Sequence, residues 1–280
     1  TNSGGGVYVS GGTFTMNGGT ITYCSAIDSG GGVYVTGEDT PCTFKMLYSA
    51  NITKCSAENG GGVSYYCSPD STFEILENAE ISNNIAYGNN GNGGGGIYLY
   101  GNLTMEGGTI SGNEAPSGAG VYVRDGSSSF TMNGGKISDN KATVSGAGVY
   151  LSDSTSSFTM TYVTISNNLV NNENKGASIY YNSPNATVNL LGNSIVTSTS
   201  EMFTKNIVNG VIEEVATGGG GNATQSISTF SDLRSAIDNA NTNSLSYTLE
   251  NPCVIYIGDS FLTDDDTALT LEISTHVKLV

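Results

Sequence analysis

Tryptophan is absent from this 280-residue sequence, histidine occurs once, and charged residues make up only 12% of it. The single histidine, His276, excludes metal centres built from several histidines. No run of about 18 apolar residues is present, which excludes a transmembrane helix within this sequence. Nine basic residues stand against 25 acidic ones, and the net charge of −16 argues against nucleic acid and anionic membranes as partners.

Glycine and tyrosine are abundant instead, with 39 and 16 copies, and they occur in a recurring motif. The motif is a pair of small residues followed by an apolar–Tyr–apolar triplet, first seen as Gly5-Gly6-Val7-Tyr8-Val9. Successive copies begin their triplets at Val7, Val33, Val63, Ile97, Val121, Val149 and Ile179, with spacings of 26, 30, 34, 24, 28 and 30 residues. A period of this length predicts a stacked repeat architecture.

Each copy contains three short apolar segments. In the first two segments apolar residues lie two apart, which is the period of a β-strand and not of a helix. The first segments are Val7/Val9, Val33/Val35, Val63/Tyr65, Ile97/Leu99, Val121/Val123, Val149/Leu151 and Ile179/Tyr181. The second are Phe14/Met16, Phe44/Met46, Phe73/Ile75, Leu103/Met105, Phe130/Met132, Phe158/Met160 and Val188/Leu190; the third supply Ile21, Ile52, Ile81, Ile110, Ile137, Ile165 and Ile195.

Each copy has three short strands, and equivalent residues of successive copies would stack on one another. This pattern predicts an all-β parallel β-helix. About seven coils would stack roughly 4.8 Å apart, the spacing of neighbouring strands. A single coil would bury too little surface to be stable alone, so each coil would depend on its neighbours.

A polar column supports this alignment. Three residues after the isoleucine stand Asn84, Asn113, Asn140 and Asn168, whose amides could hydrogen-bond along the stack. Glycine pairs such as Gly107-Gly108 suit a bend with positive φ between the second and third strands. Coils two and three lack this pair and have one more residue there, so we expect a different corner in them.

The motifs GGGVYV (4–9), FTM (14–16), GGTI (18–21), ISGNEA (110–115) and GAGVYV (118–123) resemble the repeats of chlamydial polymorphic outer-membrane proteins. Similar repeats occur in adhesin-like surface proteins of bacteria and archaea. This sequence differs in having Val or Ile after the glycines, and Ile instead of Phe before the Asn. The resemblance implies a right-handed, pectin-lyase-like β-helix. It says little about activity, because the fold also carries lyases and hydrolases.

The pattern changes near the C-terminal end, so we predict three regions: a β-helix at 1–217, a glycine-rich linker at 218–225 and a second module at 226–280. In the second module, Phe230, Leu233, Ile237 and Ala240 share one helical face. Strand-like segments follow at 253–257, 268–273 and 277–280. This order predicts a helix-capped start of a second, truncated β-helix; the alternative is a C-terminal cap on the first. The sequence would be part of a longer chain with further β-helix.

Tyr8, Tyr34, Tyr98, Tyr122, Tyr150 and Tyr180 form the clearest candidate binding feature. They alternate with inward aliphatic residues, so we expect an exposed column of phenols, broken only by Ser64. Such a column could bind sugar rings or an extended peptide. The competing interpretation is that stacked aromatics only stabilise the sheet.

Catalytic chemistry is weakly indicated. Lys45 and Glu74 would point outward as neighbours, and a surface ion pair is a simpler interpretation of them than a catalytic pair. Arg124-Asp125 could imitate the basic group of a lyase. Asp264-Asp265-Asp266 is more consistent with a solvated turn than with a calcium loop. We therefore predict no metal and no cofactor.

Five cysteines indicate structural thiols or an oxidised exported protein. Cys24 and Cys55 occupy one column of adjacent coils, near the separation that a disulfide needs. Cys42 and Cys67 could also pair, which leaves Cys253 over. Free inward thiols fit the pattern equally well.

Together these observations predict a non-catalytic, extracellular or cell-surface protein that acts in adhesion or structural display. Glycans or host-surface proteins would be its partners. The alternative is a carbohydrate-active domain of lyase or hydrolase type.

Overall fold

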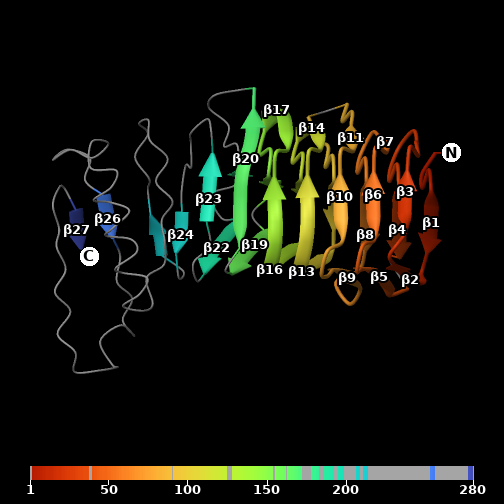
Figure 1. Cartoon of the computed structure of the whole chain (residues 1–280), viewed down its shortest axis with the longest axis horizontal. Helices are drawn as coiled ribbons and strands as arrows, with labels where there is room; N and C mark the ends of the chain where they lie inside the picture. The colour runs from red at the N-terminus through yellow and green to blue at the C-terminus, as the bar shows by residue number, and fades with distance from the viewer. Residues whose placement is uncertain are drawn as a thin grey trace.

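The computed structural model is a rod of stacked β-coils, which confirms the predicted parallel β-helix (Figure 1). The structure describes residues 2–37, 40–89, 91–124, 128–153, 155–161, 163–171, 178–182 and 186–191, and beyond these only short strands at 195–198, 206–208, 211–213, 253–255 and 277–279. None of the described residues forms a helix that is long and apolar enough to cross a membrane.

The first strands of the coils form one seven-stranded parallel sheet. Its strands are β1 (Val7–Ser10), β4 (Val33–Gly37), β8 (Val63–Cys67), β12 (Ile97–Tyr100), β15 (Val121–Val123), β18 (Val149–Leu151) and β21 (Ile179–Tyr181). Equivalent residues pair in register; Val121, for example, lies between Ile97 and Val149. The alignment read from the repeats is therefore the physical register of this sheet.

The second and third strands lie in a larger, mostly parallel sheet. Second strands are β2 (Gly12–Asn17), β5 (Cys42–Leu47), β9 (Thr72–Ile75), β19 (Ser157–Thr161) and β22 (Thr187–Leu191), and third strands are β3 (Thr20–Thr22), β6 (Asn51–Thr53), β10 (Glu80–Ser82), β20 (Thr164–Val170) and β23 (Ile195–Ser198). In coils four and five the two strands merge into β13 (Asn102–Ser111) and β16 (Ser129–Ser138).

The glycine pair acts as a bend inside these long strands. Gly108 and Gly135 have φ of 81° and 87°, and the pairing of β13 with β16 shifts register beside them. Coils two and three, which lack the pair, use Tyr48 and Glu77 at positive φ instead. The expected difference at their corner is thus confirmed.

A short fourth strand adds to the three predicted per coil. It follows the asparagine column as β7 (Ser56–Ala57), β11 (Ile85–Ala86), β14 (Glu114–Ser117) and β17 (Lys141–Ser145). Its inward alanines make a small second core with Ala119, Ala147 and Val170. Small side chains allow the chain to turn closely here before it enters the next coil.

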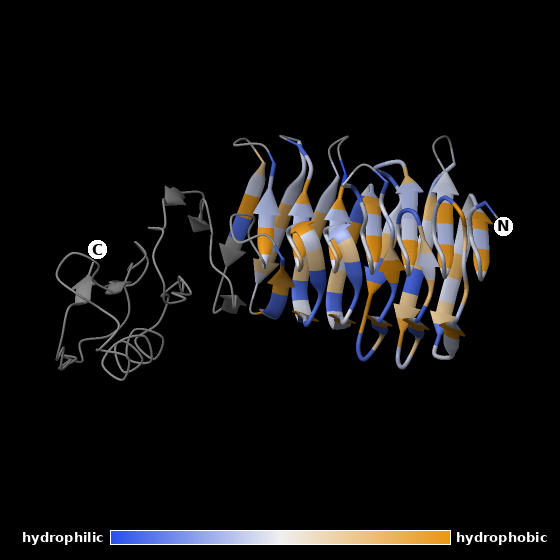
Figure 2. Ribbon diagram, turned by 90° about the horizontal axis from the view of Figure 1, so that it is seen from above, coloured by the Kyte–Doolittle hydropathy of each residue, from blue (hydrophilic) through white to orange (hydrophobic). Residues whose placement is uncertain are grey.

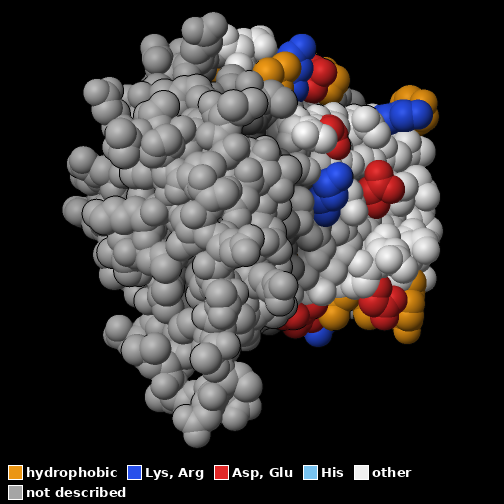
Figure 3. Space-filling view, turned by 60° about the vertical axis from the view of Figure 1, so that its left-hand side comes forward, with side chains coloured by type: hydrophobic (Ala, Val, Ile, Leu, Met, Phe, Trp, Pro, Cys, Tyr) orange, Lys and Arg blue, Asp and Glu red, His pale blue; other side chains and the backbone are white. Residues whose placement is uncertain are grey.

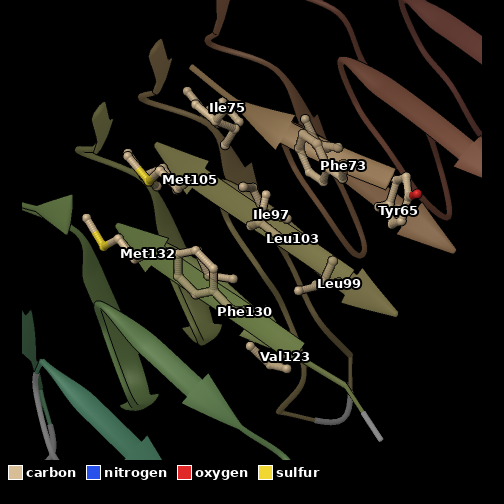
Figure 4. Close-up of a cluster of buried hydrophobic side chains, with 14 of the residues drawn as sticks. Tyr65, Phe73, Ile75, Ile97, Leu99, Leu103, Met105, Val123, Phe130 and Met132 are labelled. Atoms are coloured by element: carbon tan, nitrogen blue, oxygen red, sulfur yellow. The ribbon is translucent and has the colours of Figure 1, made fainter. Parts of the chain in front are cut away.

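The main core runs along the rod as continuous apolar ladders, visible as hydrophobic bands in Figure 2 and in close-up in Figure 4. Phe130 stacks on Phe158 with ring centroids 4.9 Å apart. Tyr65 takes an inward position that smaller apolar residues hold in most other coils, and its hydroxyl is buried with no hydrogen-bond partner. Side-chain packing and backbone pairing therefore both link each coil to the next.

The predicted asparagine column is a buried hydrogen-bonded ladder. Each side-chain amide donates from Nδ2 to Oδ1 of the next asparagine: Asn84 to Asn113 (3.0 Å), Asn113 to Asn140 (2.9 Å) and Asn140 to Asn168 (2.9 Å). Each Nδ2 also donates to an isoleucine carbonyl of the preceding coil. Each Oδ1 accepts a backbone N–H from that preceding coil as well, beginning with Cys55 N on Asn84. The ladder satisfies the corner's buried polar groups.

The glycine directly before the first strand lies against this ladder in coils three to six. A Cβ on Gly120 would lie 2.5 Å from the Gly148 carbonyl oxygen and 3.1 Å from Asn140 Nδ2. Gly96 has the same relation to the Gly120 carbonyl oxygen and Asn113 Nδ2, at 2.6 and 3.1 Å. Glycine recurs here because the backbone of one coil passes directly over the next.

The repeat pattern ends near coil seven. Val188 and Leu190 pair with Phe158 and Met160 as expected, but β23 is offset by one residue, so Val196 and not Ile195 pairs with Ile165. Placing Ile195 in the isoleucine ladder was therefore wrong. A one-residue offset changes which residues share a face. Beyond it, β24 (Asn206–Val208) pairs with β22 and makes an antiparallel hairpin with β25 (Val211–Glu213).

Two strands of the predicted second module are described. β26 (Cys253–Ile255) pairs in parallel with β27 (Val277–Leu279). The predicted linker, the helix around Phe230 to Ala240 and the 268–273 segment lie outside the described residues.

Candidate functional site

The six predicted tyrosines lie in one column on the outer face of the seven-stranded sheet. Tyr8 pairs in register with Tyr34, and Tyr98, Tyr122, Tyr150 and Tyr180 pair in succession. Their strand neighbours, such as Val121 and Val123, are fully buried in the core. The alternation therefore places the phenols outside the core, as predicted.

Ser64, which is itself buried, divides the column into a tilted Tyr8–Tyr34 pair and a longer ring stack. In the longer stack the ring centroids are 5.1 Å apart for Tyr98–Tyr122, 4.8 Å for Tyr122–Tyr150 and 5.5 Å for Tyr150–Tyr180, with planes within 20°. Burial raises the pKa of Tyr150, and the phenol of Tyr180 adds to the rise. These rings mainly face one another along the rod.

The prediction that the whole column is exposed was wrong for its middle. Tyr8 is 56% exposed, but Tyr98 is 8% and Tyr122 only 6% exposed. Each middle ring is stacked in the column, and the Tyr122 hydroxyl donates to Asn92 Oδ1 at 2.9 Å. Asn92 comes from the long loop before β12, whose length the sequence showed but whose position it did not.

A glycine turn also covers the tyrosine backbone. Gly118 has φ of 59°, and a Cβ on it would lie 2.7 Å from the Tyr122 Cα. Gly94 has the same relation to Tyr98, at 2.8 Å. The glycine before the pair of small residues thus lets the chain fold back closely against the strand that carries the tyrosine.

A second aromatic group, which the repeat motif did not predict, lies one column further along the same face. Tyr66 and Tyr100 stack with centroids 4.4 Å apart and planes 16° apart. The guanidinium carbon of Arg124 is 5.6 Å from the Tyr66 centroid and 5.8 Å from that of Tyr100. All three side chains are partly exposed. Their spacing could have identified them in the sequence, because each lies two residues after a position of the first column, namely Ser64, Tyr98 or Tyr122.

The sequence suggested only one role for Arg124, as part of an Arg–Asp pair that could imitate the basic group of a lyase. The structure places its guanidinium beside two tyrosines, and Asp125 lies outside the described residues. Lys45 and Glu74 form the expected surface ion pair, at 2.6 Å. Among the described residues, no three His, Cys, Asp or Glu side chains gather in a metal-binding arrangement. His276 and Asp264–Asp266 lie outside that part of the chain.

On the face seen in Figure 3, the described surface is mostly neither charged nor hydrophobic, with charged side chains scattered over it. Threonine, serine and asparagine cover the outer face of the second strands, for example Thr104, Thr131 and Thr159 in register. The partly exposed tyrosines therefore stand out chemically from their surroundings.

Asp153 organises the loop before β19. Its Oδ1 accepts hydrogen bonds from the backbone N–H and hydroxyl of both Thr155 and Ser156, at 2.9–3.0 Å. Burial alone would raise the pKa of Asp153, but these hydrogen bonds outweigh it and hold the pKa below the ordinary 3.8. The loop is thus ordered by a carboxylate at neutral pH.

We expect the stabilisation by Asp153 to disappear in acid. A carboxylate whose folded-state pKa is depressed stabilises the fold above its unfolded pKa, and the effect is lost as pH falls through the folded value. The melting temperature of wild type should exceed that of Asp153→Asn at neutral pH and converge with it below pH 3.8. A constant difference across this range, measured by circular dichroism, would contradict the carboxylate's role.

Cys24, Cys42, Cys55 and Cys67 are free thiols. Cys55 and Cys24 are neighbours, and burial raises the pKa of Cys55 to about 11 with a contribution from Cys24. Burial, and then the Cys42 thiol beside it, raise the pKa of Cys67. The predicted partners are therefore adjacent, while Cys42, Cys55 and Cys67 are almost completely buried.

We expect these thiols to react in order of their exposure. Cys24, which is partly exposed, should be alkylated first by N-ethylmaleimide at neutral pH. Cys42, Cys55 and Cys67 should react only in denaturant, because they are inaccessible. The raised pKa of Cys55 and Cys67 also leaves these two thiols little thiolate. Peptide mass spectrometry measures this order. A mass lower by two hydrogens for Cys24–Cys55 or Cys42–Cys67 before reduction would show a disulfide instead.

Comparison with known proteins supports the architecture. A family model described as a right handed beta helix region matches residues 6–212, which is most of the chain. No curated protein and no solved structure matches the sequence significantly.

Proposed function

This chain belongs to the right-handed β-helix family, and from that premise we propose that it is a non-catalytic adhesion and display module, exported to the cell surface. Its partners would be glycans or host-surface proteins, bound on the outer face of the seven-stranded sheet. The family alone does not separate adhesion from catalysis, so the proposal depends on what this chain places on its surface.

The observation that carries the proposal is the pair of aromatic groups on one outer face. Tyr34, Tyr150 and Tyr180 are partly exposed in the first column, and Tyr66 and Tyr100 in the second. Large apolar rings gathered on a solvated face are unusual unless they stabilise a sheet or bind a partner. Ring stacking accounts for the buried middle of the first column, and a binding role accounts better for the partly exposed rings.

The rigid interior supports a display role. The asparagine ladder and the stacked core join all the coils from three to six, so residues on one face keep a fixed mutual spacing. Loops of varying length occur at the corners, for example 87–96, without changing the register of the strands. Such a scaffold can present a repeated surface over many coils.

A binding assay with a product readout tests the proposal. The full 280-residue chain, immobilised on beads, is incubated with a panel of soluble polysaccharides and with cultured epithelial cells. We expect retention of at least one of these with no new reducing ends and no unsaturated sugar product. Product formation would instead support the carbohydrate-active alternative, and absence of any binding would overturn the adhesive role.

A variant separates binding from sheet stabilisation. Replacing Tyr34 and Tyr150 with serine should weaken retention while the melting temperature stays close to that of wild type. Tyr48→Ser is the matched control, because Tyr48 is 56% exposed and lies at a corner away from this sheet. Loss of stability in proportion to binding would favour a purely structural role for the column.

A further inference from the structure

We propose that Tyr66, Tyr100 and Arg124 form a subsite for the ring of a neutral sugar within an extended glycan. This inference rests on the adhesive function proposed above and names its ligand class. We call these three residues the aromatic subsite.

The aromatic subsite has a defined place in the fold. Tyr66 and Tyr100 pair in register at the ends of β8 and β12, and Arg124 follows β15 with its backbone N–H on the Leu99 carbonyl. The neighbouring positions in the column are the smaller Thr36, in register with Tyr66, and Ser152, whose N–H bonds the Val123 carbonyl. Smaller side chains therefore flank the three residues of the subsite along the column.

The position of the guanidinium follows from the distances. Its carbon is almost equally far from the two ring centroids, at 5.6 and 5.8 Å, while the centroids are 4.4 Å apart. If it continued the stack beyond Tyr100, it would lie several ångströms further from Tyr66 than from Tyr100. Arg124 thus lies beside the pair, next to both rings, and not over the outer face of one of them.

This arrangement matches what a sugar ring presents. A pyranose has apolar C–H faces that pack on aromatic rings, and hydroxyl groups that accept and donate hydrogen bonds. The rings supply the apolar contact, and a guanidinium has five N–H donors in a fixed plane. The partly exposed Thr36 adds a hydroxyl group beside Tyr66, whereas the hydroxyl of Ser152 is buried. Together they provide contact area and directional donors for one ring of a longer chain.

Charge favours a neutral sugar over an acidic one. The sequence carries a net charge of −16, and the loops that follow β8 and β18 place Asp70 and Asp153 in the same row of corners as Arg124. A single guanidinium would not overcome the repulsion between this net charge and a polyanion. The hydroxyl groups of a neutral sugar meet no such repulsion.

Affinity electrophoresis of the full chain tests the subsite. The probes are gels that contain xylan, galactan, glucomannan or mixed-linkage glucan, with polygalacturonate as the acidic probe. We expect retardation by at least one neutral polysaccharide, with little change between low and high salt. Tyr66→Ser combined with Tyr100→Ser should weaken that binding by about tenfold or more, as loss of a stacking contact does.

Further variants keep the test decisive if the double variant unfolds. Arg124→Gln leaves both rings in place and should weaken binding several-fold, and Tyr100→Phe should retain most of it. The control is Tyr23→Ser with Lys54→Gln, because Lys54 Nζ lies 5.1 Å from the Tyr23 ring in an exposed pair on another face. This control should bind like wild type.

The possible outcomes separate the two proposals. Binding of a neutral polysaccharide that is unaffected by Arg124→Gln and by a folded ring variant would overturn the subsite but leave adhesion standing. Retention by polygalacturonate alone, weakened by salt, would overturn the choice of a neutral sugar. Binding to cells without binding to any polysaccharide would overturn the sugar inference, and no binding at all would overturn both.

Discussion

Replacing Asn113 with alanine is expected to destabilise the rod by roughly 4 kcal/mol, because the side chain makes four buried hydrogen bonds worth about 1 kcal/mol each. Its Nδ2 donates to the Ile81 carbonyl and to Asn140 Oδ1, at 3.0 and 2.9 Å. Its Oδ1 accepts from the backbone N–H and the Nδ2 of Asn84, both at 3.0 Å. Alanine would leave the Asn84 N–H without an acceptor inside the protein.

Urea unfolding followed by circular dichroism measures this effect. Asn133→Ala is the matched control, because Asn133 is exposed and makes a single side-chain bond, from Nδ2 to Glu106 Oε1 at 2.9 Å. The control should change stability by less than about 0.5 kcal/mol. Similar losses for the two variants would show that the buried ladder contributes no more than a surface amide. Hydrogen exchange should also show faster opening of the Asn84 amide in the Asn113 variant.

Replacing Phe130 with alanine is the second change with a large expected effect, a loss of about 3–5 kcal/mol. Phe130 is 1% exposed, stacks on Phe158 at 4.9 Å and pairs in register with Leu103. The cavity would lie in the middle of the rod, where continuous packing above and below limits relaxation. Both neighbouring coils would lose contacts at once.

Phe14 provides the comparison within the same column. It occupies the equivalent position in the first coil and is only partly buried, with one ring neighbour, Phe44, at 5.4 Å. Phe14→Ala should therefore cost clearly less than Phe130→Ala in the same thermal and urea measurements. Equal losses in the free energy of unfolding would contradict a core shared between neighbouring coils. They would mean that a coil's position in the stack does not affect its stability.

Much of the fold follows from the sequence because two simple periods operate together. Alternation within a strand determines which side chains face inward, and the repeat length determines which residues stack. Those rules place Phe130 over Phe158 and Ile110 beside Ile137, as the structure does. The asparagine ladder was also predictable, since buried amides in one column have few partners other than each other.

The two periods do not predict how far other segments cover an outward side chain, or where the register shifts. Tyr98 and Tyr122 alternate with core residues, but stacking on neighbouring rings covers both, and the loop residue Asn92 binds the Tyr122 hydroxyl. Tyr66, Tyr100 and Arg124 were missed because they occur in only three coils and form no repeated motif. Ile195 fits the motif spacing, yet the pairing of β23 shifts by one residue where the repeats end. Local deviations of this kind depend on contacts between segments distant in sequence.

The asparagine amides all point the same way, and this gives the rod an electrical polarity. In all three side-chain bonds between Asn84 and Asn168, Nδ2 of one asparagine donates to Oδ1 of the asparagine on its C-terminal side. Aligned amide dipoles polarise one another, so each added member strengthens those already present. The two ends of the column are consequently unlike, one offering oxygen and the other hydrogen. Any coil that extends the column at its C-terminal end must therefore offer an acceptor, whereas one at the other end must offer a donor.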